Sequence, residues 1–159
     1  MSHMNKYADW SEADLCDETV LEIGSMSILW SKFEFLCFNK GLCEENRLHK
    51  YDNVVKIISE KIDAKKIYGA MIAYLLKRYK NIDTINERLG LSDAGEVDLK
   101  PIFSKESCDN IDACIASLHI SRRIRNNLIH GRKDEKELND FLPLFGCVNN
   151  FLLSAIKAL

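Results

Sequence analysis

The chain has 159 residues, of which 47% are hydrophobic and 29% are charged, so we expect one globular domain and not a disordered or fibrous protein. Its formal net charge of −2 means that any affinity for nucleic acid must come from a local basic patch. No apolar run approaches the roughly 20 residues that cross a bilayer, and no signal peptide is visible. We therefore expect a cytoplasmic protein without membrane contact.

The first four residues, Met1–Met4, look like a remnant of an expression vector, and we expect residues 5–159 to form a single domain. Six cysteines occur without a C-x-x-C pair or zinc-finger spacing, so we expect free thiols, no metal and no other cofactor. Three of them lie in apolar periodic segments and are expected to be small buried side chains: Cys37, Cys114 and Cys147.

Helical periodicity dominates the chain, which has only two prolines and seven glycines. The first helix is predicted from Asp17 or Thr19 to about Lys40, where Gly41 follows. Its apolar residues at helical spacing are expected to face the core: Ile23, Met26, Trp30, Phe33 and Cys37.

Two further helices are predicted at about 52–62 and 64–80, followed by a short one at 84–89 that Gly90 ends. The core face of the 64–80 helix should hold Ile67, Met71, Tyr74 and Leu75. Residues 91–105 contain Gly95, Pro101 and scattered acids, and this composition is typical of a surface loop.

A fourth long helix is predicted from Ser107 or Asp109 to about residue 130. Its expected buried residues are Ile111, Ile115, Leu118, Ile124 and Leu128. The closing helix begins after Asp134 or Asp140, and Pro143 either falls in its first turn or kinks it. These elements predict an all-α fold, a bundle of four to five helices with a short accessory helix.

The segment 122–133 reads RRIRNNLIHGRK and packs five cations, two side-chain amides and an imidazole into twelve residues. Arginine binds phosphate through a planar fork of donors, and imidazole transfers protons near neutral pH. The segment therefore indicates chemistry on a phosphodiester. A basic helix end with Gly131 as its C-cap would explain the same residues without any function.

The string Arg125-Asn126-x-x-x-His130 resembles the Arg-x(4–6)-His signature of the HEPN domain superfamily, in which a polar residue, often Asn, follows the arginine. The wider string RNNLIHG-x-K is similar to many bacterial HEPN proteins, although Arg132 stands where relatives often have a second glycine. Ile28–Glu34 resembles the first helix of such domains, which often carries W-x-x-F-E. The resemblance covers most of the chain from about Thr19 onward.

The resemblance implies a metal-independent endoribonuclease in which a ribose 2′-hydroxyl attacks the adjacent phosphate. It assigns acid–base chemistry to His130, stabilisation of the transition-state charge to Arg125, and orientation of the histidine or phosphate to Asn126. Glu34 would hold Arg125 or His130 in place, unless it is merely a solvated or core-edge carboxylate. The expected RNA contacts are Arg122, Arg123, Asn127, Arg132 and Lys133.

On an ideal helix Arg125 points about 140° away from His130, so one undistorted helix cannot easily place both on one phosphate. A symmetric homodimer whose interface includes the end of this helix could bring the motifs of the two copies together. We expect a stand-alone toxin or anti-phage effector that acts on RNA and is restrained by an antitoxin or another regulatory partner. The alternative is a non-catalytic HEPN module that binds a nucleotide, RNA or a partner protein and dimerises.

Overall fold

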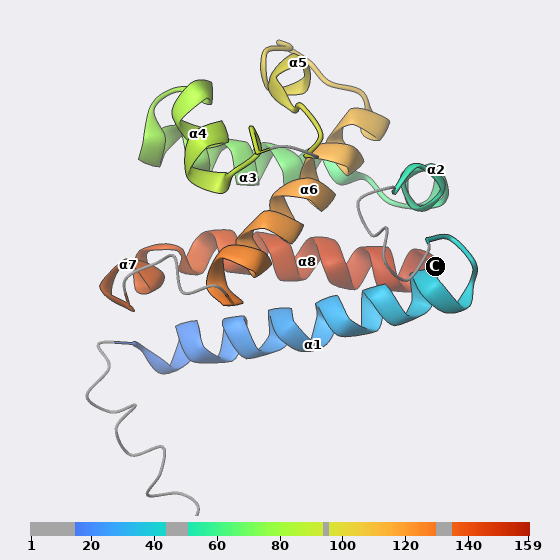
Figure 1. Cartoon of the computed structure of the whole chain (residues 1–159), viewed down its shortest axis with the longest axis horizontal. Coiled ribbons are helices and arrows are strands. Elements are labelled where there is room, and N and C mark those ends of the chain that lie inside the picture. Colours follow the sequence, from blue (N-terminus) through green and yellow to red (C-terminus); the bar gives the residue numbers. More distant parts are fainter. Residues whose placement is uncertain (1–14, 44–50, 94–95, 130–134) are drawn as a thin grey trace, which may run out of the picture.

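The computed structural model describes residues 15–43, 51–93, 96–129 and 135–159. Within these ranges the chain forms eight helices and no strand, which confirms the predicted all-α fold (Figure 1). None of the described helices is long and apolar enough to cross a membrane. The segment Met1–Met4, expected to be a vector remnant, lies outside the described residues.

Two long helices, α1 (Asp17–Asn39) and α8 (Leu142–Ala158), lie side by side and run in the same direction (Figure 1). Hydrogen bonds also link both ends of α1 to the C-terminal part of the chain, one to the segment just before α8 and one to the residue that follows it. The backbone N–H of Cys16 donates to Asn139 Oδ1 at 3.0 Å, and the Lys40 ammonium donates to the carbonyl of Leu159. The buried face of α1 carries Thr19, Met26, Trp30, Phe33 and Cys37.

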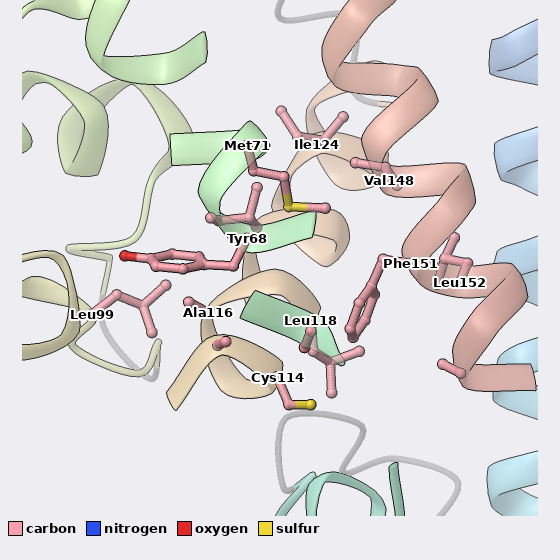
Figure 2. Packing of buried hydrophobic residues seen from close by; sticks show 14 of the residues in the cluster. Tyr68, Met71, Leu99, Cys114, Ala116, Leu118, Ile124, Val148, Phe151 and Leu152 are labelled. Atoms are coloured by element: carbon pink, nitrogen blue, oxygen red, sulfur yellow. The ribbon is translucent and has the colours of Figure 1, made fainter. Parts of the chain in front are cut away.

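The helix α6 (Asn110–Ile129) crosses this pair and packs mainly against α3 (Ala64–Tyr79) and α2 (Asp52–Lys61) (Figure 1). The core lies where α3, α6 and α8 meet. Figure 2 shows Met71 of α3 beside Ile124 of α6 and Val148 of α8, with Phe151 beside Leu118. Burial of this apolar surface is the main force that holds the helices together.

The bounds of the first three helices match the sequence prediction, and capping side chains fix the starts of α3 and α4. Asp63 Oδ1 accepts a hydrogen bond from the backbone N–H of Lys65 at 3.1 Å at the start of α3. Asn81 Oδ1 accepts one from Thr84 at 2.8 Å at the start of α4 (Ile82–Leu89). Gly90 ends α4 with a φ of 70°.

Two predictions need correction. Ile111, in the first turn of α6, was expected in the core but is 53% exposed. Residues 91–105 are more than a surface loop, since they include a short helix, α5 (Lys100–Phe103), and several buried apolar side chains. These are Leu91, Leu99, Ile102 and Phe103.

The closing segment consists of two helices, α7 (Glu135–Asp140) and α8, and Pro143 falls in the first turn of α8 without kinking it. The six thiols are free: Cys37 and Cys114 are buried as predicted, and Cys147 is half-buried. Burial raises the pKa of the Cys114 thiol to about 11, so it stays protonated near neutral pH.

Candidate functional site

The start of α6 is fixed by one amide side chain. Asn110 Nδ2 donates to the carbonyls of Ser59 and Ile62 at 2.6 and 2.8 Å, and its Oδ1 accepts from the backbone N–H of Ala64 at 2.8 Å. These bonds satisfy free backbone groups at the end of α2 and the start of α3. The helix that carries the motif is therefore anchored at one end, and the motif lies at the other.

The middle of α6 is buried on almost every side because α2, α3, α4 and α8 surround it. Leu118, Ile120 and Ile124 enter the apolar core, and His119 is also buried, with its ring edge-on to Tyr51 at 5.8 Å between centroids. Arg122 and Arg123 follow this buried part of α6, where a charge without a partner of opposite sign is energetically costly.

Arg122 forms a bidentate ion pair with a carboxylate of the segment between α4 and α5. Its Nη1 lies 2.8 Å from Glu96 Oε1 and 2.7 Å from Oε2. The Glu96 side chain is only 7% exposed, and that of Arg122 is 21% exposed. This shielding strengthens the attraction between the two charges compared with a pair in open solvent.

Arg123 is buried and contacts three acceptors. Its Nε donates to the carbonyl of Leu89 at 2.7 Å, its Nη1 to Glu96 Oε1 at 3.1 Å, and its Nη2 to Asp93 Oδ2 at 3.2 Å. We call Arg122, Arg123, Asp93 and Glu96 the arginine–carboxylate cluster. It ties the end of α4 and the following segment to α6, so Arg123 is not on the surface where RNA was expected to lie.

The last turn before the end of α6 holds the two motif residues Arg125 and Asn126, which are both half-buried. Arg125 Nη1 donates to Asn126 Oδ1 at 3.1 Å. Among the residues that the structure describes, no carboxylate lies within ion-pair distance of Arg125. Its positive charge is therefore available to an anion from outside the described part of the chain.

Asn127 and Glu34 do not join this pair within the described residues. Asn127 is buried and only 3% exposed, whereas the RNA contact expected of it needs an accessible amide. Glu34 is half-buried on α1 and close enough to Tyr51 to affect its titration: burial raises the pKa of that phenol, Arg122 lowers it, and Glu34 raises it further. The structure records no contact between Glu34 and Arg125.

The three remaining candidates, His130, Arg132 and Lys133, lie outside the described residues. The predicted site is thus seen in part: Arg125 and Asn126 are together, while Arg122 and Arg123 belong to the arginine–carboxylate cluster. Sequence reasoning missed Asp93 and Glu96 because their partners are 26 to 30 positions away, and no local pattern marks such a pair.

Within the described ranges no three His, Cys, Asp or Glu side chains gather into a group that could hold a metal ion. No family model matches the chain, and comparisons with curated proteins and with solved structures also find no match. A function must therefore be inferred from the fold and from the residues near the end of α6.

Proposed function

We propose that this chain is an HEPN-type, metal-independent endoribonuclease. The observation that carries the proposal is that Arg125 has no carboxylate partner among the described residues. Arg122 and Arg123 are neutralised by carboxylates inside the protein, but Arg125 has no such partner in the described part of the chain. It is held instead by the amide oxygen of Asn126. A guanidinium that is oriented but not neutralised is well suited to bind a phosphate.

The proposed reaction breaks the bond between phosphorus and the 5′-oxygen of the next nucleotide. A base takes the proton of the ribose 2′-hydroxyl, the 2′-oxygen bonds to phosphorus, and an acid protonates the leaving 5′-oxygen. The products are a 2′,3′-cyclic phosphate and a free 5′-hydroxyl. His130 would transfer these protons, and Arg125 would stabilise the added negative charge on the phosphoryl oxygens.

The other candidates take narrower roles in this proposal. Arg132 and Lys133 would contact the RNA backbone through charge. Arg122 and Arg123 would position the end of α6 through the arginine–carboxylate cluster. A homodimer could supply a second histidine. The protein would act as a cytoplasmic toxin or anti-phage effector that an antitoxin or another regulatory partner restrains.

Cleavage of matched RNA and single-stranded DNA, with and without EDTA, tests the proposal. We expect RNA cleavage that persists in EDTA and leaves cyclic-phosphate ends, with DNA intact, because the attacking group is the 2′-hydroxyl. His130→Ala should lower the rate by about 10²–10⁴-fold, while RNA binding remains. Cleavage of DNA would contradict the mechanism. Binding of RNA without cleavage, insensitive to His130→Ala and Arg125→Ala, would favour the non-catalytic module.

A further inference from the structure

Helix α1 has a buried face and an exposed face on opposite sides. The inner face packs on the core. On the outer face every position of a second row is exposed: Leu21, Gly24, Ile28, Ser31, Phe35 and Phe38. Each of these positions follows by one or two places a buried residue of the inner face or, for Gly24, the partly buried Ile23, so the outer row points away from α8. We call it the outer stripe.

The outer stripe exposes an unusual amount of apolar surface. Leu21 is 70% exposed, Ile28 is 72% exposed and Phe35 is 62% exposed. Among the described helices, none lies beyond α1 on this side of the molecule (Figure 1). Single exposed hydrophobic side chains are common, but a contiguous row along one helix marks a contact surface.

The spacing of the outer stripe indicates the kind of partner. Its positions alternate in steps of three and four residues, which is the pattern of helices that pack lengthwise against another helix. Large residues (Leu21, Ile28, Phe35) alternate with Gly24 and Ser31 until Phe38 ends the row. A Cβ built on Gly24 would meet no atom within 4 Å, so the space above it is open.

We propose that a second copy of this chain docks its α1 antiparallel on the outer stripe. In one register of such a pair the two central large residues each face a small one across the interface. Phe35 lies over Gly24 of the second copy, and Ile28 lies beside Ser31 of the second copy. Leu21 then lies opposite Phe38 of the second copy, so two apolar side chains meet at each end of the interface. The stripe is therefore complementary to itself, as an interface with two-fold symmetry requires.

Charge supports the antiparallel direction and this occupant. Asp17 and Glu18 open α1, and Lys40 follows its end, so antiparallel packing brings acids of one copy near a lysine of the other. It also opposes the two helix dipoles. The helix itself has four acids and only Lys32 as a base, whereas helices that bind anionic membranes carry lysine and arginine on their flanks.

This inference does not depend on the proposed ribonuclease, because the outer stripe is on α1 and the motif is on α6. The outer stripe is also a different surface from the end of α6, where the sequence predicted a homodimer interface. The oligomeric state can therefore be tested without any RNA.

Sedimentation velocity of the full chain over a series up to about 100 µM tests the interface. We expect a dimer whose dissociation constant rises by about 10²-fold or more in Ile28→Glu, because two carboxylates would meet near the symmetry axis. The matched control Ile111→Glu places the same charge on another exposed isoleucine and should leave the constant within about twofold. Circular dichroism should show that both variants keep their helix content.

The variant Gly24→Leu tests the register, because it adds apolar surface and a better helix former at an open position. A non-specific sticky surface would then associate more tightly. The proposed register predicts the opposite, a dissociation constant at least about tenfold higher, since the leucine occupies the space of Phe35 from the second copy. A monomeric wild type, a dimer unaffected by Ile28→Glu, or tighter association of Gly24→Leu would each overturn the proposal.

Discussion

Gly90 and Arg123 approach each other so closely that residue 90 has no room for a side chain. A Cβ at this position would lie 3.1 Å from Arg123 Cζ, closer still to its Nη2, and 2.8 Å from Asp93 Oδ2. The glycine also has a φ of 70°, which an L-residue with a side chain adopts only with strain. The Arg123 side chain can therefore reach the carbonyl of Leu89 only because the next residue, at position 90, is a glycine.

Gly90→Ala should destabilise the protein more than Gly41→Ala. Both glycines have nearly the same left-handed φ, but a Cβ at Gly41 would meet nothing within 4 Å. We expect Gly41→Ala to lower the free energy of unfolding by about 1 kcal/mol through strain alone. Gly90→Ala should cost about 2–4 kcal/mol because Arg123 must also move. Urea unfolding measures both values, and equal losses would show that the close approach carries no cost.

The arginine–carboxylate cluster predicts a second stability effect. Glu96→Ala removes a nearly buried carboxylate from two arginines and leaves Arg123 buried without this partner, so we expect a loss of about 3–5 kcal/mol. Asp83→Ala is the control, because the ion pair of Asp83 with Lys100 at 2.8 Å lies in solvent. That variant should leave the urea midpoint unchanged. A similar midpoint for both variants would refute a stabilising role for the cluster.

The helices could be predicted because their signals are local. Apolar spacing predicted the inner face of α1, and a glycine predicted the end of α1 and of α4. The start of α4 was predicted two residues too late, because the cap formed by Asn81 was not recognised. Exposure at the helix ends could not be predicted in the same way. Ile111 has the right spacing for the core, but the position of the neighbouring helices leaves it in solvent.

At the candidate site, too, the sequence predicts local neighbours but not contacts between distant segments. The adjacency of Arg125 and Asn126 follows from the sequence, and their hydrogen bond is consistent with it. The sequence does not distinguish Arg125 from Arg122 and Arg123, because all three are arginines of one helix. Only the fold brings Glu96 from a distant segment to two of them, so that among the described residues Arg125 alone of the three has no carboxylate partner.

Alkaline pH should destabilise the protein because two buried thiols resist ionisation. Burial raises the pKa of Cys37 from its ordinary 9.0 to about 12, with smaller effects of Cys43 and Glu34, and burial raises that of Cys114 to about 11. Above pH 9 the unfolded chain loses these protons while the folded chain keeps them. The free energy of unfolding therefore falls as pH rises from 9 towards 12.

Urea unfolding under reducing conditions between pH 8 and about 11 measures this decline. Cys114→Ala should be less stable at every pH but should show a shallower fall, since one buried thiol is gone. Cys16→Ser changes an exposed thiol and should reproduce the wild-type slope. An unchanged slope in Cys114→Ala would mean that this thiol does not contribute to the decline.

The three arginines near the end of α6 should separate stability from activity. Arg125→Ala removes a half-buried guanidinium without a carboxylate partner in the described residues, so the free energy of unfolding should change by only about 0.5 kcal/mol. RNA cleavage should fall by about 10²–10³-fold, because the transition-state charge loses its partner. Arg122→Ala should instead lower the urea midpoint, since Glu96 loses a bidentate partner.

Arg88→Ala, on the exposed side of α4, is the control for a general loss of positive charge. Cleavage rates are compared per folded molecule, with the folded fraction taken from each unfolding curve. If Arg125→Ala lowers cleavage no more than Arg88→Ala does, Arg125 does not bind the reacting phosphate. If Arg125→Ala unfolds the protein as readily as Arg122→Ala, its charge is compensated inside the fold, and the contrast on which the proposed ribonuclease rests is lost.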